Sequence, residues 1–165
     1  MGNNPGTING LQFTPNGPAM LHITDSVFYK NGGSGILISP TASGSAQVAI
    51  DRTHIENNSL GIVVDGTSSS GITQVFIRDS VITGTNGPGV AAKAGTVSLD
   101  RSHVVNNNFG VIANNGGTVI LSNSTIQGNG TALAVAGGAA IFSYGNNNIN
   151  ANGSFGPALT VIGQH

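Results

Sequence analysis

Apolar residues return along the chain at intervals of 21 to 28 residues. Each unit starts with a small residue and an apolar-x-apolar triplet, as in Gly10-Leu11-Gln12-Phe13, and further starts fall at residues 35, 61, 89, 110 and 132. Alternation with a period of two is typical of a strand that buries one face. Repetition at this interval is typical of a solenoid, in which each unit covers the apolar face of the next.

Each unit contains two more short strands. The second reads apolar-x-apolar, with inward positions at Leu21/Ile23, Val48/Ile50, Val75/Ile77, Val97/Leu99, Val119/Leu121 and Ala140/Phe142. Three residues later comes a hydroxyl side chain, followed by an apolar residue, at Ser26/Phe28, Thr53/Ile55, Ser80/Ile82, Ser102/Val104 and Ser124/Ile126. Strict alternation would put the hydroxyl outside, so the two residues before it must form a corner and both point outward. The chain is therefore predicted to be all-β, a single 1–165 domain of about six triangular coils in a parallel β-helix. Residues 153–165 form a partial terminal coil, in which Ala158 to Ile162 reads as one extra strand.

A column of asparagines runs through the predicted stack. It consists of Asn31, Asn58, Asn107, Asn129 and, after a two-residue insertion in the last coil, Asn152, with Thr85 in the third coil. Coils stack about 4.8 Å apart, so side-chain amides one coil apart can hydrogen-bond to each other. Asparagine also tolerates the left-handed backbone of tight corners. We expect a structural asparagine ladder.

The corner after the second strand holds two columns of charge. One column reads Asp25, Arg52, Asp79 and Arg101, and the other reads Asp51, Arg78 and Asp100. One interpretation is an acidic cluster that binds Ca²⁺ or supplies acid and base to a polysaccharide. The preferred interpretation is a neutralised ladder that maintains coil register, because each carboxylate has an arginine above or below it. Exposed pairs of this kind contribute only about 0–1 kcal/mol each.

Two further placements follow from the same alignment. Asp65 falls beside Lys93, which predicts an ion pair between coils. His54 and His103 fall on the outer face two coils apart with Val81 between them, and about 9–10 Å is too far for both to bind one metal ion.

No catalytic, cofactor or metal motif is present, so we expect no such residues. A formal net charge of −1 argues against nucleic-acid partners, and the absence of a long apolar run argues against membrane insertion.

The Gly-Ile-x-Val starts, the Ser-x-Ile-x-x-Asn phrases and the tail from Phe142 through Asn147 to Asn150 resemble right-handed parallel β-helix repeat proteins of the pectate-lyase-like superfamily. More narrowly, the chain resembles a bacterial group without assigned activity. The resemblance implies a right-handed coil and favours an extracellular or periplasmic location. Enzymes of the superfamily use clustered aspartates, Ca²⁺ or an isolated Arg or Lys base, and none of these motifs can be placed residue by residue on this sequence.

Apolar residues also occupy predicted outer positions, which suggests an association face. Its members are Leu37, Val63, Ile112, Phe76, Ile120 and Ile141. The alternative is that loops cover part of this surface. The partners we consider are a second copy, flanking domains and a glycan.

Long loops lengthen the first three coils at one corner, with the sequences TPNGP, PTASGSAQ and DGTSSSGITQ. Insertions on one side of a repeat protein often mark its binding surface. The preferred function is a non-catalytic structural or binding module, carbohydrate-contacting or surface-associated. The alternative is a polysaccharide lyase or glycoside hydrolase that acts on a glycan along the loop-rimmed side.

Overall fold

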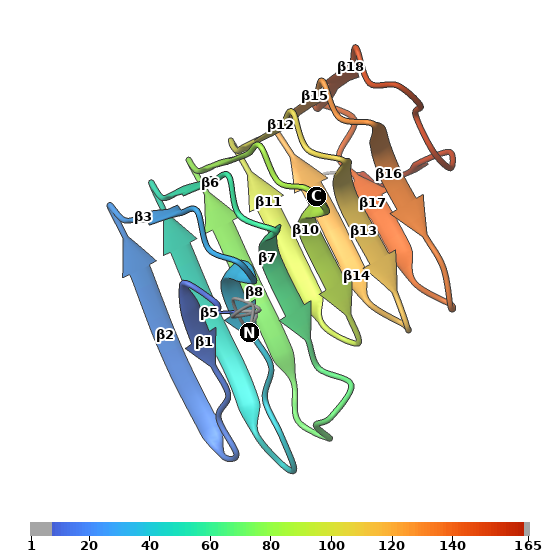
Figure 1. Ribbon diagram of the computed structural model, residues 1–165. Helices are drawn as coiled ribbons and strands as arrows, with labels where there is room; N and C mark the ends of the chain where they lie inside the picture. The colour runs from blue at the N-terminus through green and yellow to red at the C-terminus, as the bar shows by residue number, and fades with distance from the viewer. Residues whose placement is uncertain (1–7, 164–165) are drawn as a thin grey trace, which may run out of the picture.

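The computed structural model describes residues 8–163, and all regular structure in this range is β-strand. From β1 to β18 every third strand along the chain joins the same sheet, and all strand pairs are parallel (Figure 1). Sheet A contains β1 (Leu11–Phe13), β4 (Ser34–Ile38), β7 (Leu60–Asp65), β10 (Pro88–Lys93), β13 (Phe109–Asn114) and β16 (Thr131–Val135).

Sheet B follows sheet A in each coil, and sheet C follows sheet B. Sheet B contains β2 (Pro18–Thr24), β5 (Ser45–Asp51), β8 (Thr73–Arg78), β11 (Thr96–Asp100), β14 (Thr118–Ser122), β17 (Ala140–Ser143) and β19 (Thr160–Val161). Sheet C contains β3 (Val27–Tyr29), β6 (His54–Glu56), β9 (Val81–Thr83), β12 (His103–Val105), β15 (Thr125–Gln127) and β18 (Asn148–Asn150). The predicted all-β solenoid of about six three-sided coils is confirmed.

The predicted register holds through the first five coils. In sheet A, Leu11 pairs with Ile36 and Ile36 with Ile62, and the column continues through Val90, Val111 and Leu133. The inward columns of the three sheets form the core, whose largest fully buried side chains include Ile36, Ile50, Ile55, Ile62, Ile77, Ile82 and Leu99. The hydroxyl side chains predicted to point inward from the corner are buried as well, at Thr53, Ser80, Ser102 and Ser124. The extra terminal strand is confirmed in part as β19, which pairs with β17.

Both tight corners of the coil use left-handed backbone. After sheet B, the second corner residue has a φ between 46° and 50° at Asp25, Arg52, Asp79, Arg101 and Asn123. After sheet C, positive φ falls on the residue before the asparagine column, at Lys30, Asn57, Gly84, Asn106, Gly128 and Ala151. The expectation that the column asparagines themselves carry this backbone is therefore wrong. The chain turns at the residue before each column asparagine. The asparagine itself can therefore direct its side chain along the stack.

The last coil departs from the predicted register. Val119 pairs with Ile141 and Ile120 with Phe142, so Ile141 points into the core, where it is 5% exposed, and Phe142 faces outward. The assignment of Ile141 to an outer association face is wrong. Ala140, Ile141 and Phe142 are all apolar, so alternation cannot choose their side. The connection from Val135 to Ala140 has the same length as the connection from Ala113 to Thr118 in the coil before. This equal length sets the register of β17 on β14.

The same shift changes the insertion before Asn152. Leu121 pairs with Ser143, an offset of 22 residues, whereas Thr125 pairs with Asn148, an offset of 23. The corner therefore contains one inserted residue (23 − 22 = 1) rather than two.

The connections from sheet A to sheet B are longest in the second and third coils, at residues 39–44 and 66–72. The other four coils connect the sheets through residues 14–17, 94–95, 115–117 and 136–139. The longer strands β2, β5 and β8 run into these loops at one corner (Figure 1). The long loops predicted for the first three coils are thus present in the second and third, whereas in the first coil the added residues lie in the longer strand β2. Within the described residues, no helix is long and apolar enough to span a membrane.

Candidate functional site

The asparagine column forms two runs of hydrogen bonds between coils, one from Asn31 to Asn58 and one from Thr85 to Asn152. Asn31 donates to Asn58 Oδ1 from its backbone nitrogen at 2.9 Å and from Nδ2 at 2.8 Å. Asn107 donates to Asn129 Oδ1 in the same two ways, at 2.9 and 3.1 Å, and Asn129 donates likewise to Asn152. Each of these side chains therefore bonds to a neighbouring coil.

Nδ2 also ties the asparagine to a strand of sheet C in the preceding coil. Nδ2 of Asn58, Asn107 and Asn129 donates to the carbonyls of Phe28, Ile82 and Val104, at 3.0, 3.2 and 3.0 Å. In the third coil the column residue is Thr85, whose backbone N–H bonds to the next coil as the asparagines do but whose side chain does not. Its N–H donates to Asn107 Oδ1 at 3.0 Å, and its hydroxyl donates to the Gly87 carbonyl instead.

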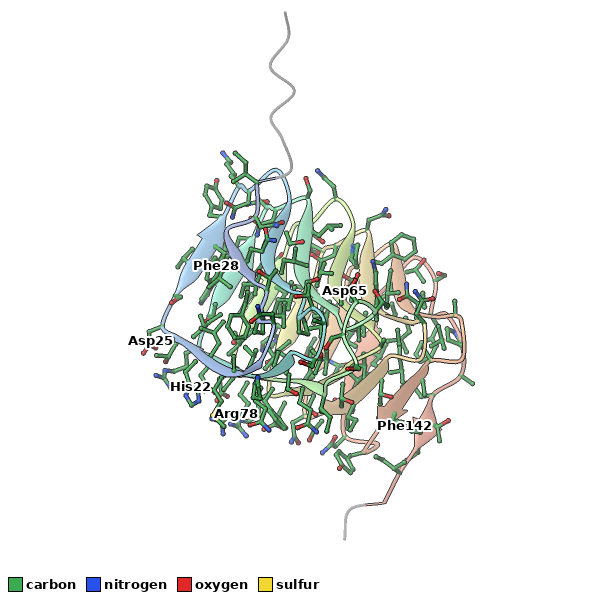
Figure 2. The ribbon with its side chains drawn as sticks, turned by 90° about the horizontal axis from the view of Figure 1, so that it is seen from below. His22, Asp25, Phe28, Asp65, Arg78 and Phe142 are labelled. Atoms are coloured by element: carbon green, nitrogen blue, oxygen red, sulfur yellow. The ribbon has the colours of Figure 1, made fainter. Side chains whose placement is uncertain are left out.

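The two columns of corner charge come together as an exposed strip, which we call the charge strip. Arg52 Nε lies 2.7 Å from Asp25 Oδ1, Arg78 Nε lies 2.8 Å from Asp51 Oδ1, and Arg101 Nε lies 2.9 Å from Asp79 Oδ1. Each arginine thus reaches back to the carboxylate of the preceding coil. Asp25, beside the corner, and Arg78 both project from the outside of the coil (Figure 2).

Asp100 closes the strip at its far end. Its carboxylate accepts hydrogen bonds from Arg101 Nη1 at 2.5 Å and from Asn123 Nδ2 at 2.9 Å. All four carboxylates of the strip are therefore hydrogen-bonded to a guanidinium.

These contacts lower the pKa of two of the four carboxyl groups. Hydrogen bonds from the Arg52 guanidinium lower the pKa of Asp25, and those from Arg101 lower the pKa of Asp79. A general acid needs a pKa raised toward the working pH, so these two carboxyl groups shift away from that role.

The remaining predicted placements are also accounted for. Asp65 Oδ2 lies 3.4 Å from Lys93 Nζ, which confirms the predicted ion pair. Partial burial opposes ionisation of Asp65, but hydrogen bonds from Thr67 and the charge of Lys93 leave its pKa below the ordinary value. His54 and His103 both pair with Val81, on either side of it, as predicted. Among the described residues, no group of three or more potential ligands could hold a metal ion.

The six residues predicted as an association face do not form one exposed surface. Phe76 is 50% exposed, whereas Val63 is only 6% exposed and Ile141 belongs to the core. Leu37, Ile112 and Ile120 are partly buried. On the outer face of sheet A, Val63 lies between Leu37 and Ala91, and Ala91 is 4% exposed. Position on the outer face of the sheet therefore does not make these side chains accessible.

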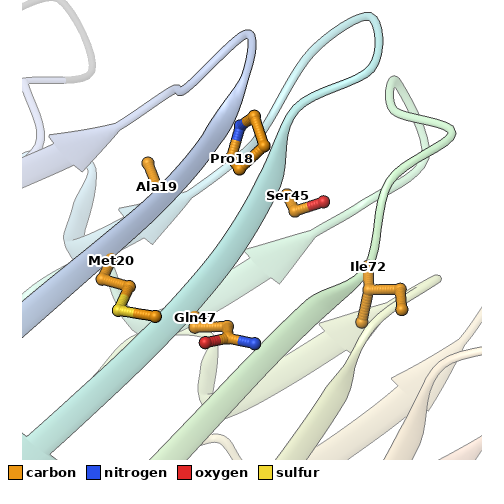
Figure 3. A pocket seen from close by; sticks show the side chains of 6 residues that line it. All are labelled: Pro18, Ala19, Met20, Ser45, Gln47 and Ile72. Carbon is orange, nitrogen blue, oxygen red and sulfur yellow. The ribbon is translucent and has the colours of Figure 1, made fainter.

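The outer face of sheet B carries a groove instead. A hollow of about 490 Å³ lies across β2, β5 and the end of the loop that precedes β8 (Figure 3). It is lined by Pro18, Ala19, Met20, Ser45, Gln47 and Ile72. A shallower hollow of about 190 Å³ continues from it and shares Met20 and Gln47, with His22, Val48, Ala49 and Phe76 as further lining residues. We call the two together the sheet B groove.

The lining of the sheet B groove is mostly apolar and contains no Asp, Glu, Lys or Arg. Met20 is 73% exposed, Ile72 67% and Phe76 50%, and such a grouping of large exposed apolar side chains is typical of a binding surface. Polar contacts come from the Gln47 amide, the Ser45 hydroxyl and the His22 imidazole. Pockets that bind small molecules share this composition, in which apolar surface surrounds a few polar groups that orient the ligand.

Sequence reasoning found the loops beside this groove and Phe76 within it, but not the groove itself. Met20 pairs with Gln47, and Gln47 with Gln74, so the lining comes from residues about one coil apart in sequence. The available signal was that Met20 and Phe76 occupy outward positions on the strands next to the long loops.

The stacked parallel sheets, with two short left-handed corners in each coil, define a parallel β-helix. Residues 41–161 match the family model described as a right handed beta helix region, and the chain belongs to that family. The searches of curated proteins and of solved structures gave no significant match.

Proposed function

We propose that the protein is a non-catalytic binding module that holds an uncharged glycan in the sheet B groove. The observation that carries the proposal is the composition of the groove, in which exposed Phe76 and Met20 stand beside the Gln47 amide. Sugars present apolar C–H faces and a rim of hydroxyls. An aromatic ring packs against the former, and an amide can both donate to and accept from the latter.

The repeat supports a polymeric ligand. Outward positions of sheet B recur one coil apart, so Met20, Gln47 and Gln74 form a column with a spacing of about 4.8 Å along the stack. The loops 14–17, 39–44 and 66–72 border the groove at one end, where Pro18, Ser45 and Ile72 line it. Such a rim is where repeat proteins commonly bind their partners.

The state of the carboxylates favours binding over cleavage. Glycoside hydrolases need two carboxyl groups across the scissile bond, one of them with a raised pKa. Here the strip carboxylates are held by arginines, the pKa of Asp25 and Asp79 is lowered, and no carboxylate lines the groove.

The test is a binding screen of the whole chain against neutral and acidic oligosaccharides, with and without Ca²⁺, followed by titration calorimetry on any hit. We expect a neutral glycan to bind and Phe76→Ala to weaken binding roughly ten-fold, equivalent to about 1.4 kcal/mol. Tyr29→Ala is the matched control, because Tyr29 is an aromatic residue of similar exposure (49%) on sheet C, and it should leave binding unchanged.

Three results would overturn the proposal. One is the absence of binding to every neutral glycan, and another is binding that Phe76→Ala does not affect. The third is release of reducing ends or unsaturated products that is lost in Asp51→Asn or Asp79→Asn, which would favour the polysaccharide lyase or hydrolase.

Sedimentation of the chain and of its Phe76→Ala, Leu37→Asp and Ile112→Asp variants tests a second copy of the chain as the occupant of the groove. A dimer that Phe76→Ala dissociates would replace the glycan with that copy. A dimer that instead dissociates in Leu37→Asp or Ile112→Asp would place self-association on sheet A.

A further inference from the structure

Seven Asn-Gly pairs occur in the chain, and they are open to a spontaneous reaction. They start at Asn9, Asn16, Asn31, Asn86, Asn115, Asn129 and Asn152. In this reaction the glycine backbone nitrogen attacks the asparagine Cγ, a new C–N bond closes a five-membered succinimide, and the side-chain nitrogen leaves as ammonia. Water then opens the ring to aspartate or isoaspartate. The attacking nitrogen must lose its proton and approach Cγ, so a hydrogen bond from that N–H opposes the reaction.

Five of the seven glycine N–H groups donate to a backbone carbonyl of a neighbouring coil. The bonds run from Gly10 to Ser34, Gly87 to Ser59, Gly116 to Gly137, Gly130 to Asn107 and Gly153 to Asn129, at 2.8–3.0 Å. The parallel stacking of coils thus restrains the nucleophile at most of these pairs.

The pair Asn16-Gly17 is different. It lies in the loop 14–17, where the carbonyls of Pro15 and Gly17 accept hydrogen bonds from Thr41 and Ser45 of the next coil, at 2.9 and 3.2 Å. Within residues 8–163, no acceptor is found for the Gly17 N–H, and no side-chain hydrogen bond is found for Asn16. Asn16 is exposed, and a Cβ placed on Gly17 would have no atom within 4 Å, which leaves room for the ring.

In the remaining pair, Asn31-Gly32, the asparagine side chain that would be attacked is held in place. The Asn31 Nδ2 donates to Asn58 Oδ1 at 2.8 Å, and the Asn31 backbone nitrogen donates to the same oxygen at 2.9 Å. The side chain must leave this ladder before its Cγ can turn toward the backbone of residue 32.

We propose that Asn16 is the deamidation site of this protein. The product places a carboxylate two residues before Pro18, which lines the sheet B groove (Figure 3), and changes the formal net charge from −1 to −2. The isoaspartate form also lengthens the backbone of the loop by one methylene. The modification does not depend on what the groove binds.

The test is incubation of the folded chain at mildly alkaline pH, followed by peptide mapping with mass spectrometry. We expect Asn16 to convert roughly 2- to 10-fold faster than Asn115, the factor associated with opening one backbone hydrogen bond. Asn115 is the matched control, because it is also exposed and followed by glycine, but the Gly116 N–H is bonded to Gly137. In urea the conversion rates of Asn16 and Asn115 should converge, because the coil is unfolded there. Gly17→Ala should slow conversion at Asn16 in the folded chain.

Two outcomes would overturn the proposal. One is conversion at Asn115, or at any of the other pairs, that matches or exceeds conversion at Asn16 in the folded protein. The other is a ratio between Asn16 and Asn115 that persists in urea, because the preference would then come from local sequence rather than from the coil.

Discussion

Replacement of Asn107 by alanine tests the energetic role of the asparagine ladder. Asn107 is 4% exposed and makes three side-chain hydrogen bonds. Its Oδ1 accepts from the Thr85 N–H, and its Nδ2 donates to the Ile82 carbonyl and to Asn129 Oδ1. Truncation to alanine removes all three bonds at once in the middle of the stack.

The expected loss in the free energy of unfolding follows from the hydrogen-bonding groups that Asn107→Ala leaves without a partner. Thr85 is 4% exposed, and its N–H loses its acceptor, which costs about 1–3 kcal/mol for a buried donor. The two bonds from Nδ2 contribute about 0.5–1.5 kcal/mol each. The sum is about 2–6 kcal/mol, and we expect a loss of about 3 kcal/mol in the free energy of unfolding. In a chain of this size that loss lowers Tm by roughly 6–12 °C.

The assay is urea unfolding followed by far-UV circular dichroism, with a thermal melt on the same samples. Asn108→Ala is the control, because it makes the same substitution one residue away on an exposed side chain. We expect this control to stay within about 0.5 kcal/mol of the parent. A value for Asn107→Ala that is no larger than that of the control would refute the idea that the ladder stabilises the stack.

Two further predictions concern the register of the last coil and the effect of acid. Ile141→Asp should lose at least about 3 kcal/mol more unfolding free energy than Phe142→Asp, because only Ile141 is buried. Equal losses in urea titrations would contradict the register. Lowered pKa values at Asp25 and Asp79 mean that the native state holds these protons less tightly than the unfolded chain. The contribution of these two ion pairs to the free energy of unfolding is present above the ordinary carboxyl pKa of 3.8 and is lost as pH falls through the lower native pKa. Melting temperature should therefore drop below about pH 4, and less so in Asp25→Asn/Asp79→Asn than in the parent.

Much of the fold could be read from the repeat because each coil supplies the same kinds of inward residue. The pairing of Leu11 with Ile36 and of His54 with Val81 was predictable from alignment alone. Prediction was wrong where one coil differs locally from the others. At Ile141 three apolar residues in a row hide the alternation, and the register depends on loop length instead.

The candidate site was predictable only in part, because exposure depends on neighbours that are distant in sequence. Val63 and Phe76 both read as outward apolar residues, yet Val63 is 6% exposed and Phe76 is 50% exposed. The sheet B groove needs Met20, Gln47 and Ile72, which come from three different coils. No short segment of the sequence contains the groove.

The sequence by itself determined the coil period, the inward columns of the first five coils and the order of charges in the charge strip. These features depend on residue type repeated at a nearly constant interval. The tertiary structure decided that each arginine bonds to the carboxylate of the preceding coil, that the left-handed residue precedes the asparagine, and that the groove lies on sheet B. The physical reason is that hydrogen bonds and accessible surface depend on the distances between coils, whereas periodicity specifies only which residues share a column.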